Sequence, residues 1–263
     1  MSELARRAAF LIFNAGRTAD RFVRVTDYLG AGTRQLADMR EDSVCTWRDF
    51  YRTHPSHDGK LLPWEEDVVT RFVRSASDVL VIGCGSGRDV VAFAERGCRV
   101  TGVDSVDLAI GECRRILASR DLTAELVQGF FEDAHVTGAF ETVVFSYYCY
   151  AAMLGTSRRV DALRKAAGLL KSGGHIIISH AVGNVPPRRI LIQLGRLAGR
   201  LAGSDWRLEP GDLVWSNPGT APSYSCTHVF AEGEVEREAR SAGLQVDLRQ
   251  VADNTAVFVL RSA

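Results

Sequence analysis

An excess of charge of either sign is absent from this sequence of 263 residues, because 32 Lys and Arg balance 32 Asp and Glu. Nucleic-acid-binding proteins usually gather basic residues on one face, since phosphate neutralisation dominates their affinity. We therefore expect no nucleic-acid partner. Hydrophobic residues make up 46% of the chain and charged residues 24%, as in ordinary globular domains. The length suits one large domain with additions.

Long hydrophobic runs and paired cysteines are also missing. No stretch is long enough to cross a bilayer, and the apolar run at residues 8–13, which resembles a short signal peptide, is soon interrupted by polar residues. The six cysteines form no Cys-x-x-Cys pair and show no zinc-binding spacing. We expect free thiols, no metal site and a cytoplasmic location.

From residue 78 onward, short apolar runs alternate with helical stretches. The strands predicted in this way cover residues 79–82, 99–103, 124–128, 142–146 and 175–179, and the helices between them include residues 110–119 and 160–170. This order predicts right-handed βαβ units and a parallel sheet of five strands. After a helix at 232–242, two β-like runs at 244–251 and 256–260 predict an antiparallel hairpin at the C-terminal edge.

The two flanking segments have a different pattern. Residues 1–40 place apolar residues and arginines at helical spacing, and turn residues at 51–60, including His54 and His57, predict a loop before a helix at 65–74. We expect an N-terminal helical cap or lid over residues 1–62 and a core over residues 63–263. Residues 184–228 break the alternation and predict an insertion in that core.

Arginines and leucines dominate part of this insertion, at residues 188–201. Three interpretations of the arginines remain open. They face water on a cap helix, they bind an anionic ligand, or they let an amphipathic helix lie on a membrane surface.

The strongest functional signal is an apolar strand that runs directly into Gly83-Cys84-Gly85-Ser86-Gly87 at the start of a helix. Glycines in such a turn let a ligand approach the backbone closely. Nicotinamide and flavin sites use Gly-x-Gly-x-x-Gly. Here the third glycine falls one position early and Arg88 takes its place, which argues against an NAD(P)-dependent oxidoreductase, the rival enzyme class.

The Gly-x-Gly-x-Gly spacing resembles motif I of the class I S-adenosylmethionine-dependent methyltransferases. The resemblance implies an α/β fold with a Rossmann-like doubly wound sheet, S-adenosylmethionine as cofactor and S-adenosylhomocysteine as product. Asp104 and Ser105, at the end of the second strand, resemble motif II, which implies that Asp104 binds the ribose hydroxyls. The Leu-Lys-Ser-Gly-Gly stretch ending at Gly174 extends the resemblance, which covers residues 65–183.

The ends of the third and fourth strands are less regular. Phe130 stands where the family usually has an acidic residue. Either the phenylalanines, Phe131 among them, pack on the adenine while Glu132 or Asp133 supplies a polar contact, or this stretch is core followed by a turn. After the fourth strand, Ser146 and Tyr147 are similar to motif IV, which implies contact with the cofactor; the resemblance also marks Tyr147 as a candidate for contact with the methyl acceptor.

Residues from Tyr224 to His228, and Ala242-Gly243-Leu244, resemble the small-molecule branch of the family. The resemblance implies methyl transfer to an oxygen or nitrogen atom of a small molecule, with the insertion as part of the acceptor pocket. His180 and His228 are candidates for the general base, or are histidines satisfied by the backbone. A non-catalytic protein that binds the cofactor is the alternative. Nothing in the sequence indicates an oligomeric state.

Overall fold

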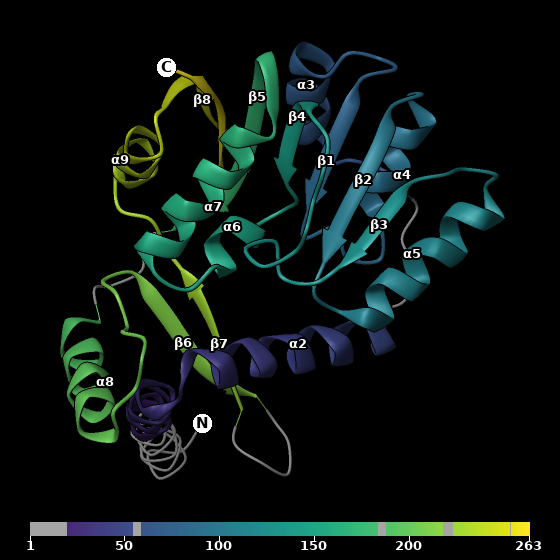
Figure 1. The fold of residues 1–263 in the computed structure, drawn as a ribbon. Coiled ribbons are helices and arrows are strands. Elements are labelled where there is room, and N and C mark those ends of the chain that lie inside the picture. Colours follow the sequence, from purple (N-terminus) through teal and green to yellow (C-terminus); the bar gives the residue numbers. More distant parts are fainter. Residues whose placement is uncertain (1–19, 55–58, 184–187, 218–222, 253) are drawn as a thin grey trace, which may run out of the picture. The chain divides into compact units, whose positions relative to one another are not determined.

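The computed structural model describes residues 20–54, 59–183, 188–217, 223–252 and 254–263 (Figure 1). The chain divides into two compact units: the larger unit contains residues 44–185 and 227–263, and the smaller unit contains residues 1–43 and 186–226. The cap at 1–62 and the core at 63–263 stay predictions. Residues 1–19 of that cap, and His57, lie outside the described residues.

The larger unit is built on a seven-stranded sheet with the order β3-β2-β1-β4-β5-β9-β8. The first five strands are parallel; β9 runs antiparallel to β5, and β8, at the edge, runs antiparallel to β9. The predicted α/β class, parallel sheet and C-terminal hairpin are therefore confirmed. The strands are β1 (Asp78–Ile82), β2 (Arg99–Asp104), β3 (Glu125–Gln128), β4 (Phe140–Phe145), β5 (Leu170–Ala181), β8 (Leu244–Ala252) and β9 (Thr255–Ser262).

Helices cover both faces of this sheet (Figure 1). Val79 and Val81 of β1 pack with α3 (Pro63–Phe72), α4 (Arg88–Glu95) and α5 (Asp107–Ser119). Leu80 and Ile82 point to the opposite face and pack with α6 (Cys149–Ala152), α7 (Thr156–Gly168) and α9 (Glu234–Ser241). Strands buried on both faces read as continuous Val, Ile and Leu runs, which is why the alternation was visible in the sequence.

Two element boundaries differ from the prediction. β5 begins at Leu170, where a helix was predicted, and it includes His180, which was predicted to follow the strand. Its pairing shifts between Leu170 and His175, so residues 171–174 form an irregularity that the Gly-Gly pair makes possible. α2 (Leu36–Thr53) continues through residues 51–53, where a loop was predicted. Phe50 stacks on His54 at 4.6 Å, and such i, i+4 contacts stabilise a helix.

The smaller unit contains the helical residues 20–33, the first part of α2, α8 (Arg189–Ala202), and most of a hairpin of β6 (Asp212–Asn217) and β7 (Ser223–His228). α8 matches the Arg/Leu-rich stretch, whereas the hairpin was not predicted. Tyr28 ties the first helix to the start of β6 by donating to the backbone oxygen of Asp212 at 2.7 Å. Among the described residues, no helix combines the length and apolar character needed to cross a bilayer.

A buried ion pair connects the helices on one face of the larger unit. The Arg159 side chain in α7 is fully buried, and its Nε and Nη2 donate to Glu238 of α9 at 3.0 and 2.7 Å. Tyr150 of α6 donates to the other Glu238 oxygen at 2.6 Å. Because every charge in this group has a partner, removing one partner would leave a buried charge uncompensated.

We expect Arg159→Met to lower the free energy of unfolding by about 3–5 kcal/mol, measured by urea denaturation, because Glu238 then keeps a buried charge without its cation. Arg115→Met is the matched control, since Arg115 makes the same two-bond contact with Glu112 but is 64% exposed. The control should change stability by at most about 1 kcal/mol. Equal effects of the two variants would contradict this account.

Candidate functional site

The turn between β1 and α4 requires glycine at three alternate positions. Gly83, Gly85 and Gly87 have φ values of 69°, 53° and 99°, in the left-handed region that favours glycine. A side chain at these positions would also collide with neighbouring atoms. A Cβ on Gly83 would lie 2.7 Å from Cys149 Cβ, and a Cβ on Gly87 would lie 2.4 Å from Cys113 Sγ. The spacing recognised in the sequence is therefore a steric requirement of this turn.

Asp104, at the end of β2, is the acidic residue nearest this turn in the hydrogen-bond network. Its Oδ2 accepts from the Gly85 amide and its Oδ1 from the Val106 amide, both at 2.8 Å. Burial raises the pKa of Asp104, and these two hydrogen bonds oppose that shift. A carboxylate has about four acceptor positions, so both oxygens can also accept from a pair of ligand hydroxyls.

The side chain of Tyr51, in α2, contacts the same turn. The sequence pattern alone did not identify this residue. A Cβ on Gly85 would lie 2.2 Å from the Tyr51 hydroxyl. Burial raises the pKa of Tyr51, and the nearby Asp104 carboxylate adds to the shift, so the phenol stays protonated. The signal was the aromatic repeat Trp47, Phe50, Tyr51 and His54, which has helical spacing.

A cavity of about 540 Å³ lies between α2 and α5. Asp107, three residues after Asp104, is in its wall and accepts from Nε and Nη2 of Arg48 at 3.1 and 3.0 Å. Ligand pockets typically span about 300–1,000 Å³, so this volume suits a small molecule. The cavity is lined by Arg48, Arg52, Asp107, Leu108, Gly111 and Glu112.

Arg88, in the place of the third glycine of a nicotinamide site, is held by two carboxylates at the start of α4. Its Nη2 donates to Glu65 at 2.6 Å and its Nε to Asp89 at 2.7 Å. Burial raises the pKa of Glu65, the Asp89 charge adds to this, and Arg88 opposes it. The guanidinium also lies 5.8 Å from the centre of the Tyr147 ring.

The chain leaves β4 through a strained residue. Ser146 is buried, and its amide donates to Ile82 at 2.8 Å. Tyr147 has a φ of 46°, rare for a residue with a Cβ, and its backbone oxygen accepts from Ser179. Burial raises the pKa of Tyr147, and Tyr148, stacked on it at 4.1 Å, adds to the shift. The phenol therefore stays protonated near neutral pH.

The residues after β3 have partners within the protein. Phe131 is buried edge-on against Phe145 at 6.1 Å, with the Lys165 ammonium 4.8 Å from its ring centre. Glu132 pairs with Arg158 at 2.5 Å. The Phe131 ring is thus covered by core side chains, and contact of this stretch with the adenine stays a prediction.

His180 lies near the carboxyl end of β5, in contact with Phe230 and Phe258. Its Nδ1 lies 3.0 Å from the Ala181 oxygen, and since a carbonyl only accepts, Nδ1 carries the proton in the neutral ring. Nε2 is then the basic atom. Burial lowers the pKa of His180, which keeps the imidazole neutral near pH 7.

His228, at the end of β7, has a carboxylate partner. Its Nε2 lies 2.9 Å from Glu234 Oε1, and the same oxygen lies 3.7 Å from Arg159 Nη2. Burial raises the pKa of Glu234, but the hydrogen bond from His228 and the other partners outweigh burial and hold the pKa low. His228 is therefore oriented by a charged carboxylate.

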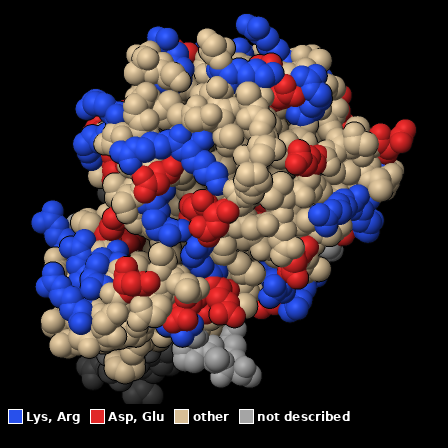
Figure 2. Space-filling model, in the orientation of Figure 1, with Lys and Arg blue, Asp and Glu red and all other residues tan. Residues whose placement is uncertain are grey.

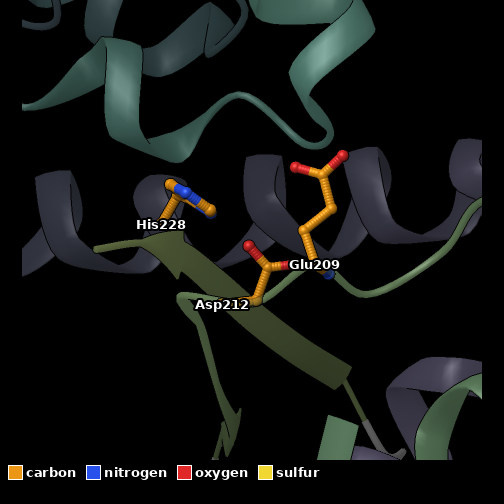
Figure 3. Close-up of side chains that lie close together, drawn as sticks. All are labelled: Glu209, Asp212 and His228. Carbon is orange, nitrogen blue, oxygen red and sulfur yellow. Dashed lines mark hydrogen bonds between the residues drawn. The ribbon is translucent and has the colours of Figure 1, made fainter. Parts of the chain in front are cut away.

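Figure 3 shows Glu209 and Asp212 at the start of β6, and His228 at the end of β7. The Glu209 amide donates to Asp212 Oδ2 at 2.6 Å, so the two carboxylate residues belong to one turn of the smaller unit. His228 belongs to the larger unit, where Glu234 is its partner.

A family of known proteins matches the part of the chain that contains the glycine turn and Asp104. Residues 79–174 match a family described as "Methyltransferase domain". A cypemycin N-terminal methyltransferase from Streptomyces sp. is 32% identical over 96 residues, which are 36% of this chain and 38% of the relative. The matched part thus spans well under half of that protein.

Solved methyltransferase structures share the fold. A S-adenosylmethionine-dependent methyltransferase from Methanosarcina mazei superposes with a TM-score of 0.60 at 19% identity, over 77% of this chain and 98% of the other. The 1,6-didemethyltoxoflavin-N1-methyltransferase of Burkholderia thailandensis, with bound 1,6-didemethyltoxoflavin and S-adenosylhomocysteine, gives 0.61 at 19% identity, over 86% and 88%. Residues 79–174 therefore match a methyltransferase domain, and the chain shares the fold of solved methyltransferases.

We expect Gly85→Ala to destabilise the protein by at least about 1 kcal/mol more than Gly97→Ala in chemical denaturation. Both glycines have positive φ, but a Cβ on Gly97 meets nothing within 4 Å, whereas one on Gly85 meets Tyr51. In a Tyr51→Ala background the extra cost should disappear, as a double-mutant cycle would measure. Equal costs in the wild-type background would refute the contact between Tyr51 and the turn.

Proposed function

We propose that this protein binds S-adenosylmethionine and transfers its methyl group to an oxygen or nitrogen atom of a small molecule. The observation that carries the proposal is the 2.8 Å hydrogen bond that joins the glycine turn to Asp104, within a domain that matches methyltransferases. The cypemycin relative is named an N-terminal methyltransferase and the toxoflavin relative an N1-methyltransferase, which supports transfer to a polar atom.

The residues present fit this cofactor. Gly83, Gly85 and Gly87 all have positive φ, and such a glycine turn lets a ligand approach the backbone closely. In our proposal Gly83, Cys84, Gly85 and Gly87 pass beside the methionine part, Asp104 and Ser105 hold the ribose, and Ser146 and Tyr147 lie near the sulfonium. Tyr51 covers the turn, and the cavity between α2 and α5 has Asp107, three residues after Asp104, in its wall.

When bound, the cofactor supplies an activated methyl group that passes to the acceptor and leaves S-adenosylhomocysteine. The chain's own task is to align the acceptor and exclude water, since in-line displacement needs collinear atoms. A hydroxyl or ammonium acceptor must also lose a proton. We assign that proton to Nε2 of His180, because Nδ1 is engaged with Ala181 and burial keeps the ring neutral.

His228 has a positioning role in this proposal. Its bond to Glu234 fixes the imidazole beside Phe230, whose ring also contacts His180.

A cytoplasmic location belongs to the same proposal, and the six free cysteines support it, because thiols persist in reducing compartments.

Calorimetric titration of the full chain tests the cofactor. We expect wild type to bind S-adenosylmethionine and S-adenosylhomocysteine but not NADH. Asp104→Ala should weaken both by about 100-fold, because hydrogen bonds to a charged group contribute about 1.5–3 kcal/mol each. Asp161→Ala, which removes an exposed carboxylate on α7, should leave both affinities unchanged.

Two results would overturn the cofactor assignment: binding of NADH alone, or no binding of the adenosyl ligands by wild type. Binding without methyl transfer to any acceptor in a broad screen would instead favour the non-catalytic alternative. Failure of cofactor binding can be told apart from failure of methyl transfer, because the titration measures binding alone and needs no acceptor.

His180→Gln tests the base once an acceptor is found. We expect kcat to fall by about 10²–10⁴-fold with no change in the affinity for S-adenosylmethionine. The neutral imidazole is the active form, so the wild-type rate should fall as pH decreases through the lowered pKa of His180, below the ordinary value of about 6.5. His180 would be ruled out as the base if the wild-type rate began to fall at a pH above that value, or if His180→Gln kept the wild-type kcat.

A further inference from the structure

α8 packs inside the smaller unit through two glycines and one isoleucine. Its buried positions are Ile192, Gly195 and Gly199. A Cβ on Gly195 would lie 2.5 Å from the backbone oxygen of Tyr28, and one on Gly199 would lie 2.5 Å from that of Gly32. The backbones of α8 and of the helical residues 20–33 therefore touch, which leaves no room for large side chains between them.

Four other large apolar side chains of α8 lie on its outer face. Ile190, Leu194, Leu197 and Leu201 are 77%, 37%, 54% and 82% exposed. Their spacing of four, three and four residues places them in one stripe along about 16 Å of helix. An ordinary surface helix has the reverse arrangement, with its large apolar residues turned inward. Small residues inside and large apolar ones outside are typical of helices in contact with lipid.

The charged residues of α8 itself have one sign. Arg189 and Arg200 are exposed, and no Asp or Glu occurs between Arg189 and Ala202. Arg196 is held by the Leu208 oxygen, to which its Nε donates at 2.6 Å. Figure 2 shows basic side chains gathered over the position that α8 has in Figure 1, with uncharged side chains next to them.

A second copy of this chain fits the stripe poorly. A two-fold contact between antiparallel α8 helices would bring Arg189 of one copy near Arg200 of the other at both ends, and α8 has no acidic residue to offset them. A stable dimer also buries about 800 Å² on each partner, more than a single helical stripe offers. A lipid surface needs neither shape complementarity nor that area.

We infer that α8 is a membrane-surface helix, which inserts Ile190, Leu194, Leu197 and Leu201 at the boundary of an anionic lipid layer. Arg189 and Arg200 then lie at the level of the lipid phosphates, where their charge is favourable. The binding is peripheral, because α8 is too short to cross a bilayer. This choice among the three interpretations of the arginines is independent of the proposed methyl transfer.

Flotation of the full chain with vesicles tests the inference. We expect binding to vesicles of phosphatidylglycerol and phosphatidylcholine, weakened by salt, and at least about tenfold weaker binding to phosphatidylcholine alone. Leu197→Gln with Leu201→Gln should weaken binding by at least about tenfold, because two inserted side chains are lost. Both side chains are exposed, so the fold should be kept, as circular dichroism and thermal unfolding would verify.

Two further variants distinguish the contribution of the arginine charges from that of the apolar stripe. Arg189→Gln with Arg200→Gln should remove most of the salt dependence. Val251→Gln, on β8 of the larger unit, is the matched control, since Val251 is as exposed as Leu197 and should leave binding unchanged. Failure of wild type to float with anionic vesicles at low salt would overturn the inference. So would a concentration-dependent dimer that the Leu197 and Leu201 variant abolishes, because the stripe would then be a protein interface.

Discussion

The hydrogen bond from the Gly85 amide to the Asp104 carboxylate joins two residues that are 19 positions apart in the chain. It forms because β1 and β2 are adjacent parallel strands, so the chain leaves both at the same edge of the sheet. The left-handed φ values at Gly83, Gly85 and Gly87 bring the amide to the carboxylate. Tyr51 contacts the turn at Gly85, and Asp104 also accepts from the amide of Val106, just before α5. The arrangement of the other site residues therefore depends on this hydrogen bond.

Buried charges fix the helices around this edge, and each has a partner. Arg88 is held between Glu65 of α3 and Asp89 of α4, so two helices on one face share one cation. On the other face, Arg159 and Glu238 join α7 to α9. Such pairs contribute little net stability relative to apolar packing, but removing one partner is costly. Arg88 lies beside Tyr147, and Arg159 lies beside Glu234, the partner of His228, so both ion pairs are close to candidate site residues.

Most of the fold was predictable because its signals are local. Strands buried on both faces give apolar runs, and the glycine spacing reflects a turn whose backbone conformation favours glycine. The hairpin of β6 and β7 was not predictable in the same way, since residues 212–228 carry Ser, Asn and Pro in place of an apolar alternation. The extension of α2 through Tyr51 was missed because turn residues follow it closely.

By itself, the sequence determined the class of fold, the glycine turn, Asp104 and the resemblance to methyltransferases, because each depends on residues that are neighbours in the chain. Only the tertiary structure decided that Tyr51 covers the turn, that Phe131 is core, and which ring nitrogen of His180 is basic. It also decided which face of α8 is exposed, since the helical spacing of the sequence is compatible with burial of either face. These outcomes depend on contacts between segments far apart in sequence, and no local pattern specifies them.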